Sequence, residues 1–94
     1  MNEFAGRLDT TVVKADPALD REFEASLPVW SHLAFRVAYS VLRHHEDAED
    51  VAQEALTKAH RQLGQLRDRE RLRHWLVRMV WRMAIDRRGS DQRR

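Results

Sequence analysis

Apolar side chains recur at helical spacing along most of the chain, and short polar stretches separate the runs. The first run places apolar residues four positions apart from Leu19 to Leu27. It follows Asp16 and Pro17, which suit an N-cap and a first helical position. This pattern predicts a short helix from about residue 17, whereas residues 1–17 have no period of their own and are predicted to form a flexible leader.

Two further helical segments are predicted next. Pro28 either opens a new helix or kinks a continuing one, and this second segment runs to about Arg43. Residues 44–46 are polar and aperiodic, as expected of a connection. Asp47 is the predicted N-cap of the third helix, and Gly64 is its predicted C-cap. The buried side of this helix is predicted to hold Val51, Ala52, Ala55, Leu56, Ala59 and Leu63.

A fourth helix is predicted near the end of the chain. It begins near Arg71, after a charged loop at residues 65–70, and Gly89 and Ser90 are predicted to end it. Its predicted buried stripe consists of Leu72, Trp75, Leu76, Met79, Val80 and Met83.

Composition agrees with an all-α fold, a small bundle of about four helices. The chain of 94 residues has only three glycines and two prolines, and it has no cysteine. We expect one domain at residues 18–89 and a basic tail at 90–94, which would begin a linker to a carboxy-terminal domain outside the chain. With no apolar run near the ~20 residues of a membrane span and no secretion signal, we expect a cytoplasmic protein without membrane insertion.

Charge is divided unevenly along the chain. Residues 1–56 hold five basic and eleven acidic side chains, whereas residues 57–94 hold twelve basic and four acidic ones. The formal net charge of +2 therefore hides an acidic half of −6 and a basic half of +8. Such asymmetry indicates two partners, a basic protein surface for the first half and a phosphate backbone for the second.

Polar residues of the third helix lie opposite its apolar side. A wheel at roughly 100° per residue places Asp50, Gln53, Glu54, Thr57 and Arg61 there. Acidic residues near the start of a helix also favour its dipole, and a solvated polar face is a common arrangement. A binding surface and a solvated face are both compatible with this pattern.

The two tryptophans of the fourth helix lie on different sides of the wheel. Trp75 belongs to the apolar stripe and is predicted to pack in the core. Trp81 lies opposite the core among arginines, an arrangement suited to stacking on a single-stranded base beside its phosphates. A contact with the first helix, with the leader or with an arginine would equally account for Trp81.

Catalysis and metal binding find little support in the sequence. His45 and Glu49 are four residues apart, but no third ligand has suitable spacing. There is no glycine-rich phosphate loop, serine elbow or pair of buried carboxylates. We therefore expect no enzyme, no metal and no cofactor.

Three stretches of the sequence form a recognisable set: the DAEDVAQEA run at residues 47–55, the LRHWLVRM run at 72–79, and the AIDR run at 84–87. Together they resemble region 2 of bacterial sigma factors, most closely the extracytoplasmic-function group. The resemblance extends over about residues 19–88. It implies a transcription initiation domain that binds core RNA polymerase and that recognises and melts the minus-ten promoter element, capturing the non-template strand.

The resemblance also assigns residues to each partner. The clamp helices of the largest polymerase subunit would meet Asp50, Gln53 and Glu54, with Asp47, Thr57 and Arg61 as neighbours. Promoter DNA would meet the loop and the fourth helix, where the candidates are Leu66, Arg67, Asp68, Arg69, Arg73, His74, Arg78, Trp81, Arg82, Arg87 and Arg88. An anti-sigma factor is a further implied partner, and the implied location is the bacterial nucleoid.

The chain departs from the family pattern at three places. Arg82 replaces a frequent asparagine at a DNA-facing position, and Val77 stands where an aromatic residue is frequent. The chain also ends before a second helix-turn-helix domain, so we expect a fragment of a longer protein. Two alternatives stay open: a sigma-like domain that acts mainly through an anti-sigma factor, and an independent DNA-binding regulator.

Overall fold

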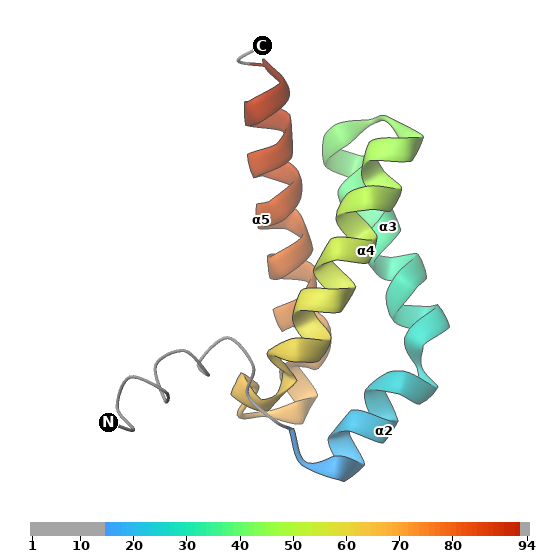
Figure 1. Ribbon diagram of the computed structural model, residues 1–94, viewed down its shortest axis with the longest axis vertical. Coiled ribbons are helices and arrows are strands. Elements are labelled where there is room, and N and C mark those ends of the chain that lie inside the picture. The colour runs from blue at the N-terminus through green and yellow to red at the C-terminus, as the bar shows by residue number, and fades with distance from the viewer. Residues whose placement is uncertain (1–14, 93–94) are drawn as a thin grey trace, which may run out of the picture.

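A computed structural model describes residues 15–92, and helices make up most of that range (Figure 1). The α-helices are α2 (Pro17–Ala25), α3 (Leu27–Leu42), α4 (His45–Arg61) and α5 (Leu72–Gln92). Two short 3-10 helices, η2 (Leu63–Gln65) and η3 (Arg69–Arg71), connect α4 to α5. The prediction of an all-α bundle of four helices is confirmed, while most of the predicted leader lies outside the described residues.

Helices α3, α4 and α5 pack against one another, and α2 lies across one end of this group (Figure 1). The largest fully buried side chains are Phe23, Val51, Leu63, Leu76 and Val80. Small residues fill much of the remaining core, which allows the helix axes to approach closely. These buried alanines are Ala34, Ala38, Ala48, Ala52, Ala55, Ala59 and Ala84.

Helix α2 begins as its sequence predicts. Oδ1 of Asp16 accepts a hydrogen bond from the backbone N–H of Ala18 at 3.4 Å, and Pro17 is the first helical residue. Leu27, however, was predicted to extend the first apolar stripe, and the structure places it in α3 with 40% of its surface exposed. The chain turns at Ser26, so Leu27 leaves the line of Leu19 and Phe23.

The start of α4 differs from the prediction. Arg43 ends α3 in a left-handed conformation (φ 54°, ψ 31°), and the extended His44 is the N-cap of α4. Nδ1 of His44 accepts the backbone N–H of Asp47 at 3.3 Å, which is the role predicted for the Asp47 side chain. Helix α4 therefore begins earlier than predicted, and the connection consists of Arg43 and His44 in place of residues 44–46. Oδ2 of Asp47 lies 3.5 Å from Nδ1 of His44, while its Oδ1 faces Arg87 on α5.

The predicted ends of α4 at Gly64 and of α5 at Gly89 are also wrong. Helix α4 ends at Arg61 with Gln62 as its C-cap, because the chain enters η2 to bury Leu63 before it reaches Gly64. Helix α5 continues through Gly89 to Gln92. A glycine inside a helix costs only about 1 kcal/mol relative to alanine, so it does not end a helix by itself.

No helix in the part of the chain that the structure describes is both long and apolar enough to cross a membrane.

Candidate functional site

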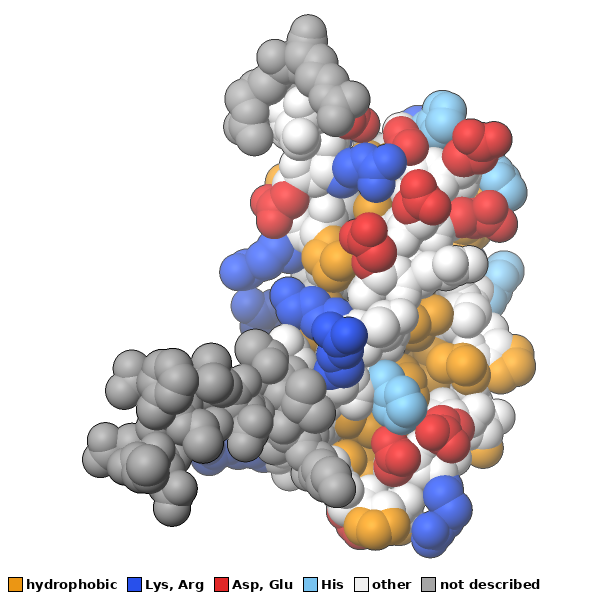
Figure 2. Space-filling view, in the orientation of Figure 1, with side chains coloured by type: hydrophobic (Ala, Val, Ile, Leu, Met, Phe, Trp, Pro, Cys, Tyr) orange, Lys and Arg blue, Asp and Glu red, His pale blue; other side chains and the backbone are white. Residues whose placement is uncertain are grey.

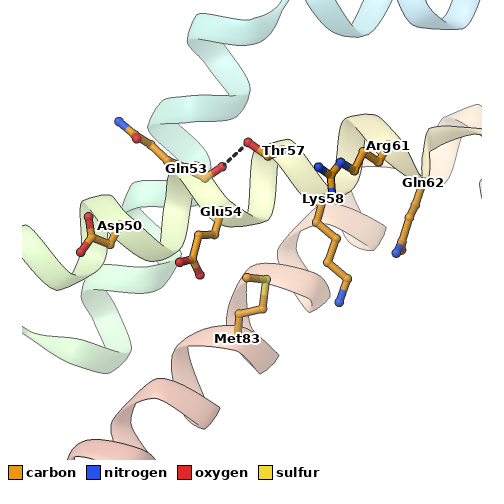
Figure 3. A pocket seen from close by; sticks show the side chains of 8 residues that line it. All are labelled: Asp50, Gln53, Glu54, Thr57, Lys58, Arg61, Gln62 and Met83. Carbon is orange, nitrogen blue, oxygen red and sulfur yellow. Dashed lines mark hydrogen bonds between the residues drawn. The ribbon is translucent and has the colours of Figure 1, made fainter. Parts of the chain in front are cut away.

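The polar side of α4 forms a continuous surface, which we call the acidic face and define as Asp47, Asp50, Gln53, Glu54, Thr57 and Arg61. All of these residues except the half-buried Asp47 are exposed. The structure brings the last five together along a shallow groove of about 590 Å³ (Figure 3). Asp47 lies one turn closer to the start of α4 and does not line this groove.

The groove lies between α4 and α5. Met83 reaches into it from α5, while Lys58 and Gln62 line it from the end of α4 (Figure 3). The Thr57 hydroxyl donates a 3.0 Å hydrogen bond to the Gln53 carbonyl oxygen within the same helix, so this donor is already satisfied. Charge changes along the groove from acidic near the start of α4 to basic near its end.

Arg87 lies against the acidic face. Its Nη2 is 2.9 Å from Oδ1 of Asp47 and 3.8 Å from Oδ2 of Asp50, and its Nε is 3.9 Å from Oδ2 of Asp91. The first two ion pairs join the end of α5 to the start of α4, and the third lies within α5. Arg87 was predicted among the DNA residues, and the structure instead places it with the predicted polymerase residues.

A second hollow, of about 500 Å³, lies where the α4–α5 connection meets α5. We call it the basic pocket because five of its side chains are cationic and only one is acidic. Its lining consists of Lys58, Gln62, Gln65, Leu66, Arg67, Asp68, Arg71, His74, Trp75, Arg78, Met79 and Arg82. Six predicted DNA residues meet here: Leu66, Arg67, Asp68, His74, Arg78 and Arg82.

Trp75 lines the basic pocket, which the sequence did not indicate. Trp75 is half-buried and packs against the core as predicted, yet it also lines the pocket. Its spacing from Arg78 and Arg82 places these three residues on neighbouring positions of one side of α5, and Arg71 lies just before them at the end of η3. That spacing was visible in the sequence, but an apolar stripe alone does not reveal that one side of it borders a cavity.

The loop that closes the basic pocket is held by local hydrogen bonds and one long-range ion pair. Oδ1 of Asp68 accepts the Glu70 N–H at 3.0 Å and so caps η3. Nη2 of Arg69 lies 2.6 Å from Oε1 of Glu22 on α2. Arg69, a predicted DNA residue, thus ties the loop to α2 and does not line the pocket.

Trp81 points outward from α5, as predicted, and 53% of its surface is exposed. It lines a shallow hollow of about 700 Å³ with Val77 and Ile85. Arg78 and Arg82 border both this hollow and the basic pocket, so the exposed indole and the pocket share two cations.

The remaining predicted DNA residues, Arg73 and Arg88, are exposed on α5 and line neither hollow.

Acidic and basic side chains are separated on the surface. Figure 2 shows Asp and Glu gathered over the first half of α4, and Lys and Arg gathered over the end of α4 and the middle of α5. The division of charge along the sequence therefore becomes a division between adjoining areas of one face.

The candidate metal ligands His45 and Glu49 lie close together, with Nδ1 of His45 3.9 Å from Oε1 of Glu49. Among the described residues no third ligand joins this pair.

Residues 30–94 match the sigma-70 region 2 family, so the chain belongs to that family. This family is a non-enzymatic domain family of transcription initiation. Membership implies binding to core RNA polymerase and to promoter DNA. The chain is 33% identical over 52 residues to the RNA polymerase sigma factor SigV of Bacillus subtilis (strain 168). That match covers 55% of this chain and 31% of the SigV chain. No solved structure matches at a significant level.

Proposed function

We propose that this domain holds core RNA polymerase with the acidic face of α4 and captures the non-template strand of the minus-ten element with the basic pocket and Trp81. The observation that carries the proposal is the pocket itself, where Lys58, Arg67, Arg71, Arg78 and Arg82 surround a half-buried indole. Cations that meet phosphates and an aromatic wall that meets a base are the two elements of single-strand binding.

Capture of a flipped base requires compensation for lost stacking. Removing one base from a duplex costs a few kcal/mol, and pocket contacts must recover that free energy. Leu66, Trp75 and Met79 offer apolar and aromatic contact area to a base, while Arg78 and Arg82 lie where they reach both the pocket and Trp81. We infer that one base enters the basic pocket and that a neighbouring base stacks on Trp81.

The acidic face is suited to a basic protein surface, and we infer that this surface is the clamp helices of the largest polymerase subunit. Carboxylates such as Asp50 and Glu54 are exposed and form no buried pair, so they act mainly on the rate and orientation of encounter. Arg87 holds Asp47 and approaches Asp50, and we assign it a positioning role for these carboxylates in place of a DNA contact.

Binding of a fluorescent single-stranded minus-ten oligonucleotide, measured by anisotropy with core polymerase present, tests the nucleic-acid half of the proposal. Arg78→Ala should weaken binding several-fold and reduce its salt dependence, because a phosphate contact would be lost. Arg36→Ala is the matched control, since Arg36 is exposed on α3 and lines neither hollow. Equal affinity for both variants would contradict the assignment. Tight binding to duplex DNA without polymerase would favour an independent regulator.

A protein partner at the α2–α3 junction is a second candidate function, and the implied partner is an anti-sigma factor. Val29 and Leu27 are 63% and 40% exposed there, two positions apart at the start of α3, and so offer apolar surface that a protein partner could cover. Val29→Asp should abolish inhibition by the cognate anti-sigma factor in a transcription assay and leave uninhibited activity unchanged. Full inhibition of this variant would exclude the junction as the docking surface.

A further inference from the structure

Three metal-ligating side chains converge away from the acidic face and the basic pocket. Asp20 and Glu24 lie one turn apart on α2, and His60 faces them from the last turn of α4. Nε2 of His60 is 2.9 Å from Oδ1 of Asp20 and 3.4 Å from Oε2 of Glu24. Their ligand atoms lie within 4.8 Å of one another, and within residues 15–92 no other such group of three is found.

The histidine ring is held in place by packing. Its ring stacks on Phe23 with centroids 5.7 Å apart and an angle of 18° between the planes. Phe23 is itself only 1% exposed, so it is a fixed support. The stacked ring presents Nε2 of His60 to the two carboxylates. Because the ring is already held in this orientation, no side-chain entropy of His60 is lost when a cation binds.

We propose that Asp20, Glu24 and His60 bind one divalent transition-metal ion of the Zn²⁺ type. Zinc bonds of ~2.0–2.2 Å to nitrogen and oxygen place tetrahedral ligands ~3.3 Å apart, close to the separations between His60 and each carboxylate. One imidazole and two carboxylates form a donor set that suits Zn²⁺ and Co²⁺. Roughly half of each side chain is exposed, which leaves room for water as the fourth ligand.

Metal binding at this position would fasten α2 to α4. Helix α2 contributes only Leu19 and Phe23 to the buried core, so its attachment depends on few apolar contacts. The same helix carries Glu22, whose ion pair with Arg69 holds the loop beside the basic pocket. A metal that fixes α2 would therefore also stabilise this loop.

The experiment is a calorimetric titration of the metal-free chain with Zn²⁺, together with the visible absorption spectrum after addition of Co²⁺. We expect one equivalent of Zn²⁺ to bind, a higher Tm on binding, and the intense visible bands of tetrahedral Co²⁺. His60→Gln should reduce Zn²⁺ affinity roughly tenfold or more because the only nitrogen ligand is lost. His45→Gln is the matched control, and it should bind Zn²⁺ as the unchanged chain does.

Two results would overturn the proposal. One is the absence of saturable Zn²⁺ binding to the unchanged chain, which would mean that the three groups form only ion pairs between helices. The other is equal Zn²⁺ affinity of the unchanged chain and the His60→Gln variant. If His60→Gln fails to fold, the Asp20→Asn and Glu24→Gln variants take its place, and each must weaken binding of Zn²⁺ and abolish the Co²⁺ bands. These measurements need neither polymerase nor DNA, so their outcome is independent of the proposed function.

Discussion

Nη2 of Arg87 on α5 lies 2.9 Å from Oδ1 of Asp47 on α4, and both side chains are about 30% exposed. The two residues are forty positions apart in the sequence, so the contact depends on how α4 and α5 pack. It joins the helix that carries the acidic face to the helix that carries the basic pocket. A partner that binds the acidic face and displaces Arg87 from Asp47 therefore acts on α5, which also lines the basic pocket.

Removal of this contact should affect polymerase binding more than DNA binding. Arg87→Ala should lower the free energy of unfolding by about 1 kcal/mol, because a partly exposed ion pair is lost. It should also weaken binding to core polymerase several-fold, while affinity for the minus-ten oligonucleotide stays nearly unchanged. Arg36→Ala is the control, because Arg36 is exposed on α3, belongs to neither predicted surface and lines neither hollow. A selective loss of DNA affinity in Arg87→Ala would return Arg87 to the DNA surface.

Charge reversal on the acidic face should abolish polymerase binding. The double variant Asp50→Arg with Glu54→Arg replaces two carboxylates that would face a basic coiled coil, so repulsion replaces attraction. Co-purification with core polymerase measures the loss, and circular dichroism verifies that helical content is kept. Glu46→Arg with Glu49→Arg makes the same change in net charge elsewhere on α4 and should retain binding. Unchanged binding of the first double variant would contradict the assignment of the acidic face.

Loss of the exposed indole should affect the nucleic-acid surface without loosening the core. Trp81→Ala should weaken binding of a single-stranded minus-ten oligonucleotide by roughly 1–3 kcal/mol, the range for base–aromatic stacking. Its Tm should change little, because 53% of the side chain is exposed. A large fall in Tm with unchanged affinity would instead assign Trp81 a packing role.

Gly89 lies inside α5, so a substitution there tests whether this helix continues through residue 89. A Cβ built at Gly89 meets nothing within 4 Å, and the residue is three positions from the end of α5. Gly89→Ala should therefore raise the free energy of unfolding by about 0.4–1 kcal/mol, because the unfolded chain loses conformational freedom. Thermal unfolding followed by circular dichroism measures this change in stability. A lower Tm would mean that α5 ends before Gly89, as the sequence alone suggested.

The sequence predicted the helices and their buried sides well because both follow from local spacing. The apolar positions of α4 and α5 and the outward direction of Trp81 all depend on a period of 3.6 residues, which the chain itself carries. Helix ends were predicted less well. At His44 a ring nitrogen supplies the cap, and at Gly64 burial of the neighbouring Leu63 decides where the helix stops.

Contacts between helices could not be predicted in the same way. Arg87 and Asp47, Arg69 and Glu22, and His60 and Asp20 are each joined across forty or more positions. Nothing in local spacing distinguishes an arginine that reaches a carboxylate on another helix from one that remains in solvent. The resemblance to sigma region 2 assigned residues to partners, but it did not reveal that Arg87 would lie on the acidic face.

Base capture in the basic pocket is the central claim, and a scan of the minus-ten non-template strand with 2-aminopurine tests it most directly. Each position is substituted in turn, and fluorescence is measured with this domain and core polymerase bound. We predict that one position shows a fluorescence change that marks an unstacked base, and that Arg78→Ala diminishes this change. An identical response at every position, or a response that Arg78→Ala leaves intact, would contradict capture of a base in this pocket.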